Sequence, residues 1–113
     1  MIEQRKDAGS LPFVSVIITG KNCKETLVKT LQSLIEQEYP KYEIIYVDAK
    51  SKDGTYELVK QFCNKWRKIR VLSAEGNPAE GRNIGILHAK GEILAFIDAD
   101  AYADRDWLRR LVF

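Results

Sequence analysis

The chain has 113 residues, of which 18 are lysine or arginine and 16 are aspartate or glutamate, so the formal net charge is +2. A chain of this length is expected to fold as one domain, and its nearly neutral charge argues against nucleic-acid binding through a basic surface. Hydrophobic residues make up 45% and charged residues 30% of the sequence, which excludes a disordered chain and provides the side chains for a core.

The first third of the chain is predicted to form an arm, a strand and a helix. Residues 1–12 are polar and end in a Leu-Pro pair, so we expect a flexible N-terminal arm and a domain over residues 13–113. A β-branched run at 13–18 predicts the first strand. Asn22 and Glu25 are spaced as in a capping box and predict the start of a helix, whose leucines recur at helical spacing until a Tyr-Pro pair.

The rest of the chain repeats this alternation. Short β-branched and apolar runs predict three more strands, at 42–47, 69–72 and 93–97. Apolar residues at helical spacing predict helices at 55–66, 80–89 and 107–112. The second strand is apolar enough to be buried on both faces, and the fourth is also expected to be a buried strand. Alternating strands and helices are typical of an α/β fold, a Rossmann-like parallel sheet with helices on both faces.

Polar residues follow the predicted strands at the edge where ligands bind in such sheets. Thr19, Asp48 and Asp98 each stand at the end of a strand. Ligands collect at the carboxyl ends of parallel strands, where the connections leave in opposite directions. We therefore expect the first and fourth strands to be adjacent, which would bring Thr19 and Asp98 together.

Asp98 and Asp100 are separated by one residue after the fourth predicted strand. If the strand continues, the two carboxylates lie on the same face, roughly 6–7 Å apart. Such a pair suits Mg²⁺ or Mn²⁺, which binds one or two protein carboxylates and completes its shell with water and phosphate oxygens. The pattern indicates a metal site for a diphosphate, although the two acids could instead only cap the segment that follows.

Several short motifs occur in order between residues 13 and 112: Val14-Ser15-Val16-Ile17-Ile18-Thr19, Leu31-Gln32-Ser33-Leu34, Gln37, Tyr39-Pro40, Glu43-Ile44-Ile45, Val47-Asp48, Ser51, Asp53-Gly54-Thr55, Gly81-Arg82-Asn83-Ile84-Gly85, Lys90-Gly91-Glu92 and Phe96-Ile97-Asp98-Ala99-Asp100. Together they resemble the N-terminal half of a family 2 glycosyltransferase of the GT-A fold. The resemblance implies a site for a nucleotide diphospho-sugar donor. It is more specific than the Asp98-Ala99-Asp100 motif alone.

The resemblance also implies roles for single residues. Thr19 would lie beside the nucleobase and ribose, and the turn after Asp48 would border the base. Arg82 and Asn83 would belong to a segment packed near the nucleotide. Asp98 would approach the ribose and take part in the metal site, where Asp100 would coordinate the Mn²⁺ or Mg²⁺ that bridges the diphosphate.

Three positions differ from the family's pattern. Ala49 stands where a second acid often contacts the base, and Ala101 stands where a further Asp is common. Lys21 replaces a frequent aromatic residue near the base and adds a cation that could meet a phosphate. The resemblance therefore does not identify the nucleobase or the sugar.

Family 2 enzymes continue beyond the Asp-x-Asp motif into a second half that supplies the acceptor pocket and the catalytic base. We therefore expect this chain to be a donor-binding half, truncated after that motif, with its catalytic residues unknown and no useful transfer alone. The expected acceptor is a glycan or a lipid-linked molecule. The apolar side of the last helix, 107–112, could drive self-association.

Three other functions fit parts of the sequence. A non-catalytic nucleotide-binding or interaction module would bind nucleotide without transferring sugar. A receiver domain would place Asp48 at a strand end, but it needs an acidic pair after the first strand, which is missing here. A dinucleotide-dependent oxidoreductase would need Gly-x-Gly-x-x-Gly after the first strand, and this motif is also missing.

The sequence predicts a soluble, cytoplasmic protein, because no apolar run reaches the about 20 residues that cross a bilayer and no secretory signal is present. Short basic clusters at Trp66-Arg67-Lys68 and Arg109-Arg110 leave contact with a membrane surface as an alternative. Cys23 and Cys63 lack the spacing of a metal site and are expected to be free thiols.

Overall fold

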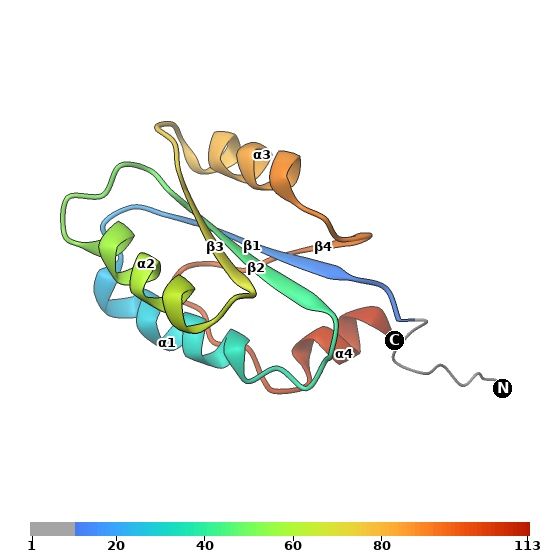
Figure 1. Ribbon diagram of the computed structural model, residues 1–113. Helices are drawn as coiled ribbons and strands as arrows, with labels where there is room; N and C mark the ends of the chain where they lie inside the picture. The colour runs from blue at the N-terminus through green and yellow to red at the C-terminus, as the bar shows by residue number, and fades with distance from the viewer. Residues whose placement is uncertain (1–10) are drawn as a thin grey trace, which may run out of the picture.

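The computed structural model describes residues 11–113, and residues 1–10 of the predicted arm lie outside this range. At the end of that arm, the Tyr39 hydroxyl donates a hydrogen bond to the Pro12 carbonyl. Strands and helices alternate along the described residues: β1 (Val14–Gly20), α1 (Lys24–Ile35), β2 (Tyr42–Asp48), α2 (Thr55–Lys65), β3 (Ile69–Ser73), α3 (Pro78–His88), β4 (Ile93–Phe96) and α4 (Trp107–Val112) (Figure 1). The predicted order of elements is confirmed.

The four strands form one parallel sheet in the order β3-β2-β1-β4. Val14 of β1 is the register partner of Tyr42 in β2 and of Ile93 in β4. The predicted adjacency of the first and fourth strands is therefore confirmed. Because all four strands run the same way, their carboxyl ends lie at one edge of the sheet.

Helices cover both faces of the sheet, as predicted. The helices α1 and α2 lie on one face and α3 lies on the other (Figure 1). The side chains of Val16, Ile44 and Tyr46 belong to the buried cluster that includes residues of α1 and α2. All seven residues of β2 are buried, because this central strand is covered on both faces.

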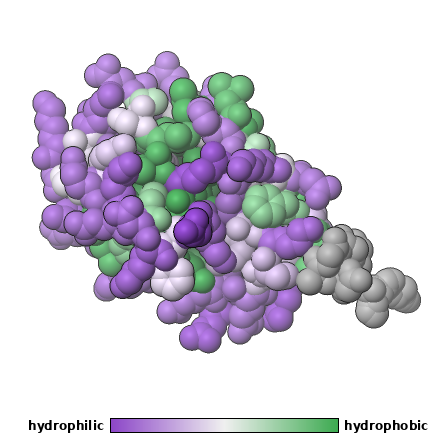
Figure 2. Space-filling model, in the orientation of Figure 1, coloured by the Kyte–Doolittle hydropathy of each residue, from purple (hydrophilic) through white to green (hydrophobic). Residues whose placement is uncertain are grey.

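Two glycines allow α3 to lie close to the sheet. A Cβ atom on Gly85 would stand 2.7 Å from Cγ2 of Ile17, and one on Gly81 would stand 3.0 Å from Cγ2 of Thr19. Larger side chains at these positions would push the helix outward. The opposite side of α3 is open to solvent, and Figure 2 shows hydrophobic surface over this helix, where Leu87 is 81% exposed.

The prediction that the fourth strand is buried is wrong. β4 is an edge strand, and of its residues only Ala95 is buried. Leu94 is 36% and Phe96 45% exposed, because no element among residues 11–113 covers them fully. An apolar sequence predicts a strand but does not show which of its faces is covered.

Among the described residues, no helix has both the length and the apolar character needed to span a membrane.

The predicted capping box at Asn22 and Glu25 is also wrong. Cys23 occupies the N-cap position of α1 without a side-chain capping hydrogen bond, and the Asn22 side-chain oxygen accepts a hydrogen bond from the Lys52 amide. A capping box is present at α3, where the Asn77 side chain accepts from the Glu80 amide and the Glu80 carboxylate accepts from the Asn77 amide, each at 2.8 Å. This cap starts α3 at Pro78, two residues before the predicted start.

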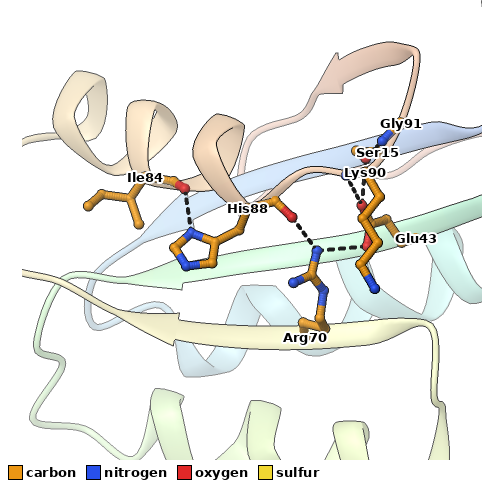
Figure 3. A network of polar contacts seen from close by, with 7 residues as sticks. All are labelled: Ser15, Glu43, Arg70, Ile84, His88, Lys90 and Gly91. Atoms are coloured by element: carbon orange, nitrogen blue, oxygen red, sulfur yellow. Dashed lines mark hydrogen bonds and ion pairs between the residues drawn. The ribbon is translucent and has the colours of Figure 1, made fainter.

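A buried carboxylate joins the C-terminal end of α3 to three strands (Figure 3). Glu43 of β2 accepts hydrogen bonds from the Ser15 hydroxyl at 2.6 Å, the Lys90 amide at 2.8 Å and the Arg70 guanidinium at 2.8 Å. Arg70 also donates to the His88 carbonyl at the last residue of α3, at 2.6 Å. We call Ser15, Glu43, Arg70 and the backbone of residues 88–91 the Glu43 network.

The electrostatics of this network favour the charged form of Glu43. Burial by itself raises the pKa of the Glu43 carboxyl, but hydrogen bonds from Ser15, Lys90 and Arg70 outweigh it and hold the pKa below its usual range. The network therefore fixes the C-terminal end of α3 to the sheet, while the two glycines allow the middle of the helix to pack close to it. These contacts position the first turns of α3, which lie beside the carboxyl edge of the sheet.

Candidate nucleotide-sugar site

Three cavities lie at the carboxyl edge of the sheet, and residues 19–21 connect them. The first cavity, of about 390 Å³, is lined by Thr19 of β1, Arg82 of α3 and Asp98 after β4. The aromatic side chains that line the same cavity are Phe96, Tyr102 and Trp107. The structure therefore brings together three of the predicted site residues and adds aromatic side chains that the sequence analysis did not identify.

The second cavity, of about 520 Å³, is lined by Lys21 and Asp100. Glu25 at the start of α1 and Asp53 before α2 also line it. The third cavity is smaller, about 170 Å³, and is lined by Thr19, Lys21 and Ala49 together with the turn before α3. Thr19 borders the first and third cavities, and Lys21 borders the second and third, so the three cavities adjoin one another.

Asp98 and Asp100 do not have the geometry expected for a continued strand. β4 ends at Phe96, and the Ala101 amide donates to the Asp98 carbonyl in a turn. The turn places Asp98 beside the first cavity and Asp100 beside the second. A run of residues after a strand can turn at once, and nothing in the residue types of 97–101 excluded an extended path.

Asp48 is buried at the end of β2 and lies apart from the three cavities. Its side chain is 1% exposed and lines none of the three cavities. One carboxylate oxygen accepts from the Tyr46 hydroxyl at 2.8 Å and the Ser51 hydroxyl at 2.7 Å, and the other accepts from the Ser51 amide at 2.8 Å. Asp48 therefore shapes the turn after β2, and Ala49, one residue later, borders the third cavity.

Asn83, like Asp48, is a predicted site residue that lies apart from the three cavities. It is exposed on α3 and lines none of the three. Its neighbour Arg82 lines the first cavity because successive residues of a helix point about 100° apart. A fourth cavity, of about 660 Å³, lies between the C-terminal ends of α1 and α2 and includes none of the predicted site residues.

The loops after β1 and β2 are joined by hydrogen bonds. The Ser51 hydroxyl accepts from the Asn22 amide at 2.8 Å, and the Asn22 side chain accepts from the Lys52 amide at 2.7 Å. The Asp53 carboxylate accepts from the Lys24 amide at 3.2 Å. Lys21 stands within the first of these joined loops, at the border of the second and third cavities.

Cys23 lies beside the same loop and remains protonated at neutral pH. Its sulfur is 3.4 Å from the Tyr46 hydroxyl. Burial raises the pKa of the thiol, and the nearby carboxylates of Asp48 and Asp53 raise it further. The position at the start of α1 therefore does not activate this thiol, and both cysteines are free, as expected.

The exposed carboxylates of Asp98 and Asp100 suit a metal ion that is held jointly by the protein and a bound ligand better than one enclosed by protein side chains. Among the described residues, no group of three or more His, Cys, Asp and Glu side chains is placed to hold a metal ion. Asp98 and Asp100 are exposed, and within residues 11–113 neither carboxylate accepts a hydrogen bond. Such acids suit a cation that takes most of its ligands from water and phosphate oxygens.

The chain is similar to known proteins over most of its length. The model of the family described as Glycosyl transferase family 2 matches residues 15–113. Glycosyltransferase AglE of Haloferax volcanii is 42% identical over 106 residues, which cover 89% of this chain and 34% of that protein.

Two solved structures have the same fold. The structure of Staphylococcus aureus TarS 1-349 in complex with UDP superposes with a TM-score of 0.80 at 32% identity, over 88% of this chain and 30% of TarS 1-349. Mannosyltransferase PcManGT from Pyrobaculum calidifontis, in complex with GDP-Man and Mn²⁺, also gives a TM-score of 0.80, at 31% identity over 90% of this chain and 34% of its own. The chain thus spans about a third of the length of each of these relatives.

Proposed function

Because this chain belongs to glycosyl transferase family 2, we propose that it binds the nucleotide diphospho-sugar donor in a sugar transfer that inverts the anomeric carbon. The observation that carries the proposal is the group of three adjoining cavities at the carboxyl edge of the sheet. There Thr19, Lys21, Arg82, Asp98 and Asp100 line adjoining cavities. This edge is where open parallel sheets bind nucleotides.

The three cavities differ in the part of the donor that each would suit. The third cavity is the smallest, and Thr19 and Ala49 line it, which supports its assignment to the nucleobase. Lys21 and Asp100 line the second cavity, so the diphosphate would lie there, next to the ammonium group. The first cavity, with Asp98 and Arg82, would then receive the ribose, which links the nucleobase to the diphosphate.

A divalent cation, Mn²⁺ or Mg²⁺, would be held by Asp100, and Asp98 would take part in the same site through water. Support comes from the exposed carboxylates of this chain and from the Mn²⁺ in the mannosyltransferase structure. When bound, such a cation neutralises charge that develops on the diphosphate leaving group. Lys21 would add a second positive charge on the same group.

In the proposed reaction, an acceptor hydroxyl oxygen attacks the anomeric carbon of the sugar. The new glycosidic bond forms as the bond to the diphosphate breaks, and the nucleoside diphosphate leaves with the electron pair. The hydroxyl proton passes to a carboxylate base that we place outside these 113 residues, together with the pocket for a glycan or lipid-linked acceptor. Within this chain, the described residues bind and orient the donor.

The proposal is tested by a thermal-shift panel of nucleoside diphosphates, with and without Mn²⁺. A ligand that binds only the folded state raises the apparent stability by mass action. We expect at least one nucleoside diphosphate to raise the melting temperature, and Mn²⁺ to increase that rise. A panel in which no nucleotide shifts the melting temperature at millimolar concentration would contradict donor binding.

A transfer assay separates the proposal from the non-catalytic alternative. A general base contributes roughly 10²–10⁴-fold to a rate, and acceptor positioning contributes further, so we expect this chain alone to show no detectable transfer. The same residues within a longer polypeptide that has the acceptor pocket should transfer sugar. Nucleotide binding without transfer in that longer polypeptide would favour the non-catalytic module.

Two surface contacts suggested by the sequence stay predictions. Leu111 and Phe113 at the end of α4 are 51% and 70% exposed, which supports self-association through this helix. Light scattering of the wild type and of a Leu111→Ser variant would measure it. Contact of the basic clusters with a membrane surface would be measured by sedimentation with anionic and neutral vesicles.

A further inference from the structure

We propose that Ser51 is a positioning residue that sets the place of Lys21 against the donor diphosphate, with Asp48 supporting Ser51 from beneath. The inference rests on the proposed function, because Lys21 matters here as a phosphate ligand. It concerns two residues, Ser51 and Asp48, neither of which lines any of the three cavities. Their effect on the ligand must therefore pass through other groups.

A chain of hydrogen bonds runs from the buried carboxylate of Asp48 to the loop after β1. The Ser51 hydroxyl donates its single proton to Asp48 at 2.7 Å, which leaves the oxygen free to accept from the Asn22 amide at 2.8 Å. Because a carboxylate offers only acceptor sites, Asp48 sets the direction of this hydroxyl. The amide of Asn22 is the first backbone donor after Lys21.

A further hydrogen bond joins the same two loops in the opposite direction. The Asn22 side-chain oxygen accepts from the Lys52 amide at 2.7 Å, so each loop contributes one side-chain oxygen to a backbone amide of the other. The Ala49 amide also donates to the Gly20 carbonyl at 2.9 Å. Lys21 therefore lies between two residues, Gly20 and Asn22, that are both bonded to the second loop.

Two residues beside these hydrogen bonds have a left-handed backbone conformation. Asn22 has a φ angle of 52° and Lys50 has a φ angle of 56°, and within residues 11–113 these are the non-glycine residues in the left-handed region. Asparagine adopts this conformation more readily than most residues, whereas a lysine holds it only where surrounding contacts require it. One such residue follows Lys21 and the other precedes Ser51, so both lie beside the hydrogen bonds that join the loops.

These contacts explain why Lys21 can be a directed ligand although its side chain is exposed. A lysine on a free loop would lose much of its binding energy to the entropy of ordering that loop. Here the loop is ordered before any ligand arrives. Removing the Ser51 hydroxyl would release the Asn22 amide and allow residues 20–22 to move.

The test is a double-mutant cycle on Ser51 and Lys21, with UDP and GDP titrated separately in the presence of Mn²⁺. We expect Ser51→Ala and Lys21→Ala each to raise the dissociation constant about tenfold, the loss of one hydrogen bond to a charged group. The double variant should bind no more weakly than Lys21→Ala alone, because Ser51 acts through Lys21. Additive losses in the double variant would overturn the proposal.

Two further variants separate positioning from general stability. Ser51→Thr retains the hydroxyl and should bind within about twofold of the wild type, because a loss of about tenfold is what one missing hydrogen bond produces. Ser73→Ala, at an exposed serine at the end of β3, is the matched control and should leave binding unchanged. A tenfold loss in Ser51→Thr, or in the Ser73 control, would contradict a specific role of the Ser51 hydroxyl.

Hydrogen exchange tests the joined loops without any ligand. In Ser51→Ala, the Asn22 amide should exchange faster than in the wild type, while the Gly91 amide, which donates to Ser15, should not change. Unchanged exchange at Asn22 would overturn the proposed coupling. If the wild type bound neither UDP nor GDP, the proposed function and the role of Lys21 would fail, while the exchange result would still decide whether Ser51 orders the loop.

Discussion

Two buried carboxylates on β2 stabilise different parts of the molecule. Glu43 is 6% exposed and lies on the face of the sheet covered by α3, whereas Asp48 is 1% exposed and lies five residues later on the other face. Glu43 accepts hydrogen bonds from β1, from β3 and from the segment before β4 (Figure 3). Asp48 accepts only from Tyr46 of its own strand and from Ser51 of the following loop among the described residues.

The difference shows how the range of a carboxylate's partners determines what it stabilises. Glu43 joins segments that are far apart in the sequence, and its partner Arg70 is a charged side chain. Loss of Glu43 should therefore weaken the whole fold. Asp48 joins neighbouring residues through neutral donors, so its loss should change the loop beside the third cavity more than the rest of the fold. The following variants test this contrast, in order of their expected effect on the free energy of unfolding.

Glu43→Ala should cause the largest loss, about 3 kcal/mol, at the lower end of the range for breaking a buried ion pair. The lower end applies because the Arg70 side chain is 33% exposed and keeps some hydration. Urea denaturation followed by circular dichroism measures the change. A loss smaller than that of Asp48→Asn would contradict the contrast between the two carboxylates.

Gly91→Ala should lower the free energy of unfolding by about 2 kcal/mol, as is typical of overpacking. The added Cβ atom would stand 2.6 Å from the backbone nitrogen of Ser15, which cannot rotate away as a side chain would. The same denaturation experiment measures it. The matched control is Lys90→Ala at the exposed neighbouring position, which keeps the backbone amide that Glu43 accepts from and should change stability by less than about 0.5 kcal/mol. Equal losses in the two variants would contradict overpacking as the cause.

Asp48→Asn should cost about 1–2 kcal/mol, because one carboxylate oxygen becomes an amide group that cannot accept from the Ser51 amide. Its effect on nucleotide binding should be larger than that of Glu43→Ala when both are measured on fully folded protein by calorimetry. Equal effects of the two variants on binding would show that α3 and the loop contribute alike to the site.

Acidification should weaken the fold through Glu43. The pKa of this carboxyl lies below its ordinary value of 4.5 in the folded state, so the charged form stabilises the fold above that value. This stabilisation is lost as the pH falls through the folded-state pKa. Denaturation between about pH 7 and pH 3 should therefore show a shallower pH dependence in Glu43→Gln than in the wild type, and equal slopes would refute the prediction.

Asp100→Asn should have the smallest effect on stability, within about 0.5 kcal/mol, because the side chain is exposed and supports no packing. The substitution removes a negative charge from the second cavity, so the Mn²⁺-dependent part of nucleoside diphosphate binding should decrease. Calorimetry with and without Mn²⁺ measures that part. Binding that neither depends on Mn²⁺ nor responds to the substitution would remove Asp100 from the metal site.

The parallel fold was predictable because its causes are local and periodic. β-branched runs alternate with helical spacing, and the connections between parallel strands must cross over the sheet. The adjacency of β1 and β4 followed from the expectation that Thr19 and Asp98 share one ligand site. The structure confirms it, and both residues line the first cavity.

The burial of β4 and the cap of α1 could not be predicted from local sequence. Ile93–Phe96 has the composition of a central strand, but its exposure depends on which elements cover it. Asn22 has the residue type of a helix cap, but its side chain bonds to Lys52, 30 residues away in the sequence. In both cases a distant segment decides between two locally acceptable arrangements.

The sequence by itself determined the fold class, the polar residues at the strand ends and the family resemblance. Periodic burial and ordered motifs are properties of residues that are close together in the sequence. Only the tertiary structure decided what each polar end does. It encloses Asp48 among donors, leaves Lys21 at the surface and sends Asp98 and Asp100 to different cavities. The reason is physical: whether a carboxylate can meet a ligand depends on whether the surrounding chain buries it, and burial is set by the packing of the whole fold.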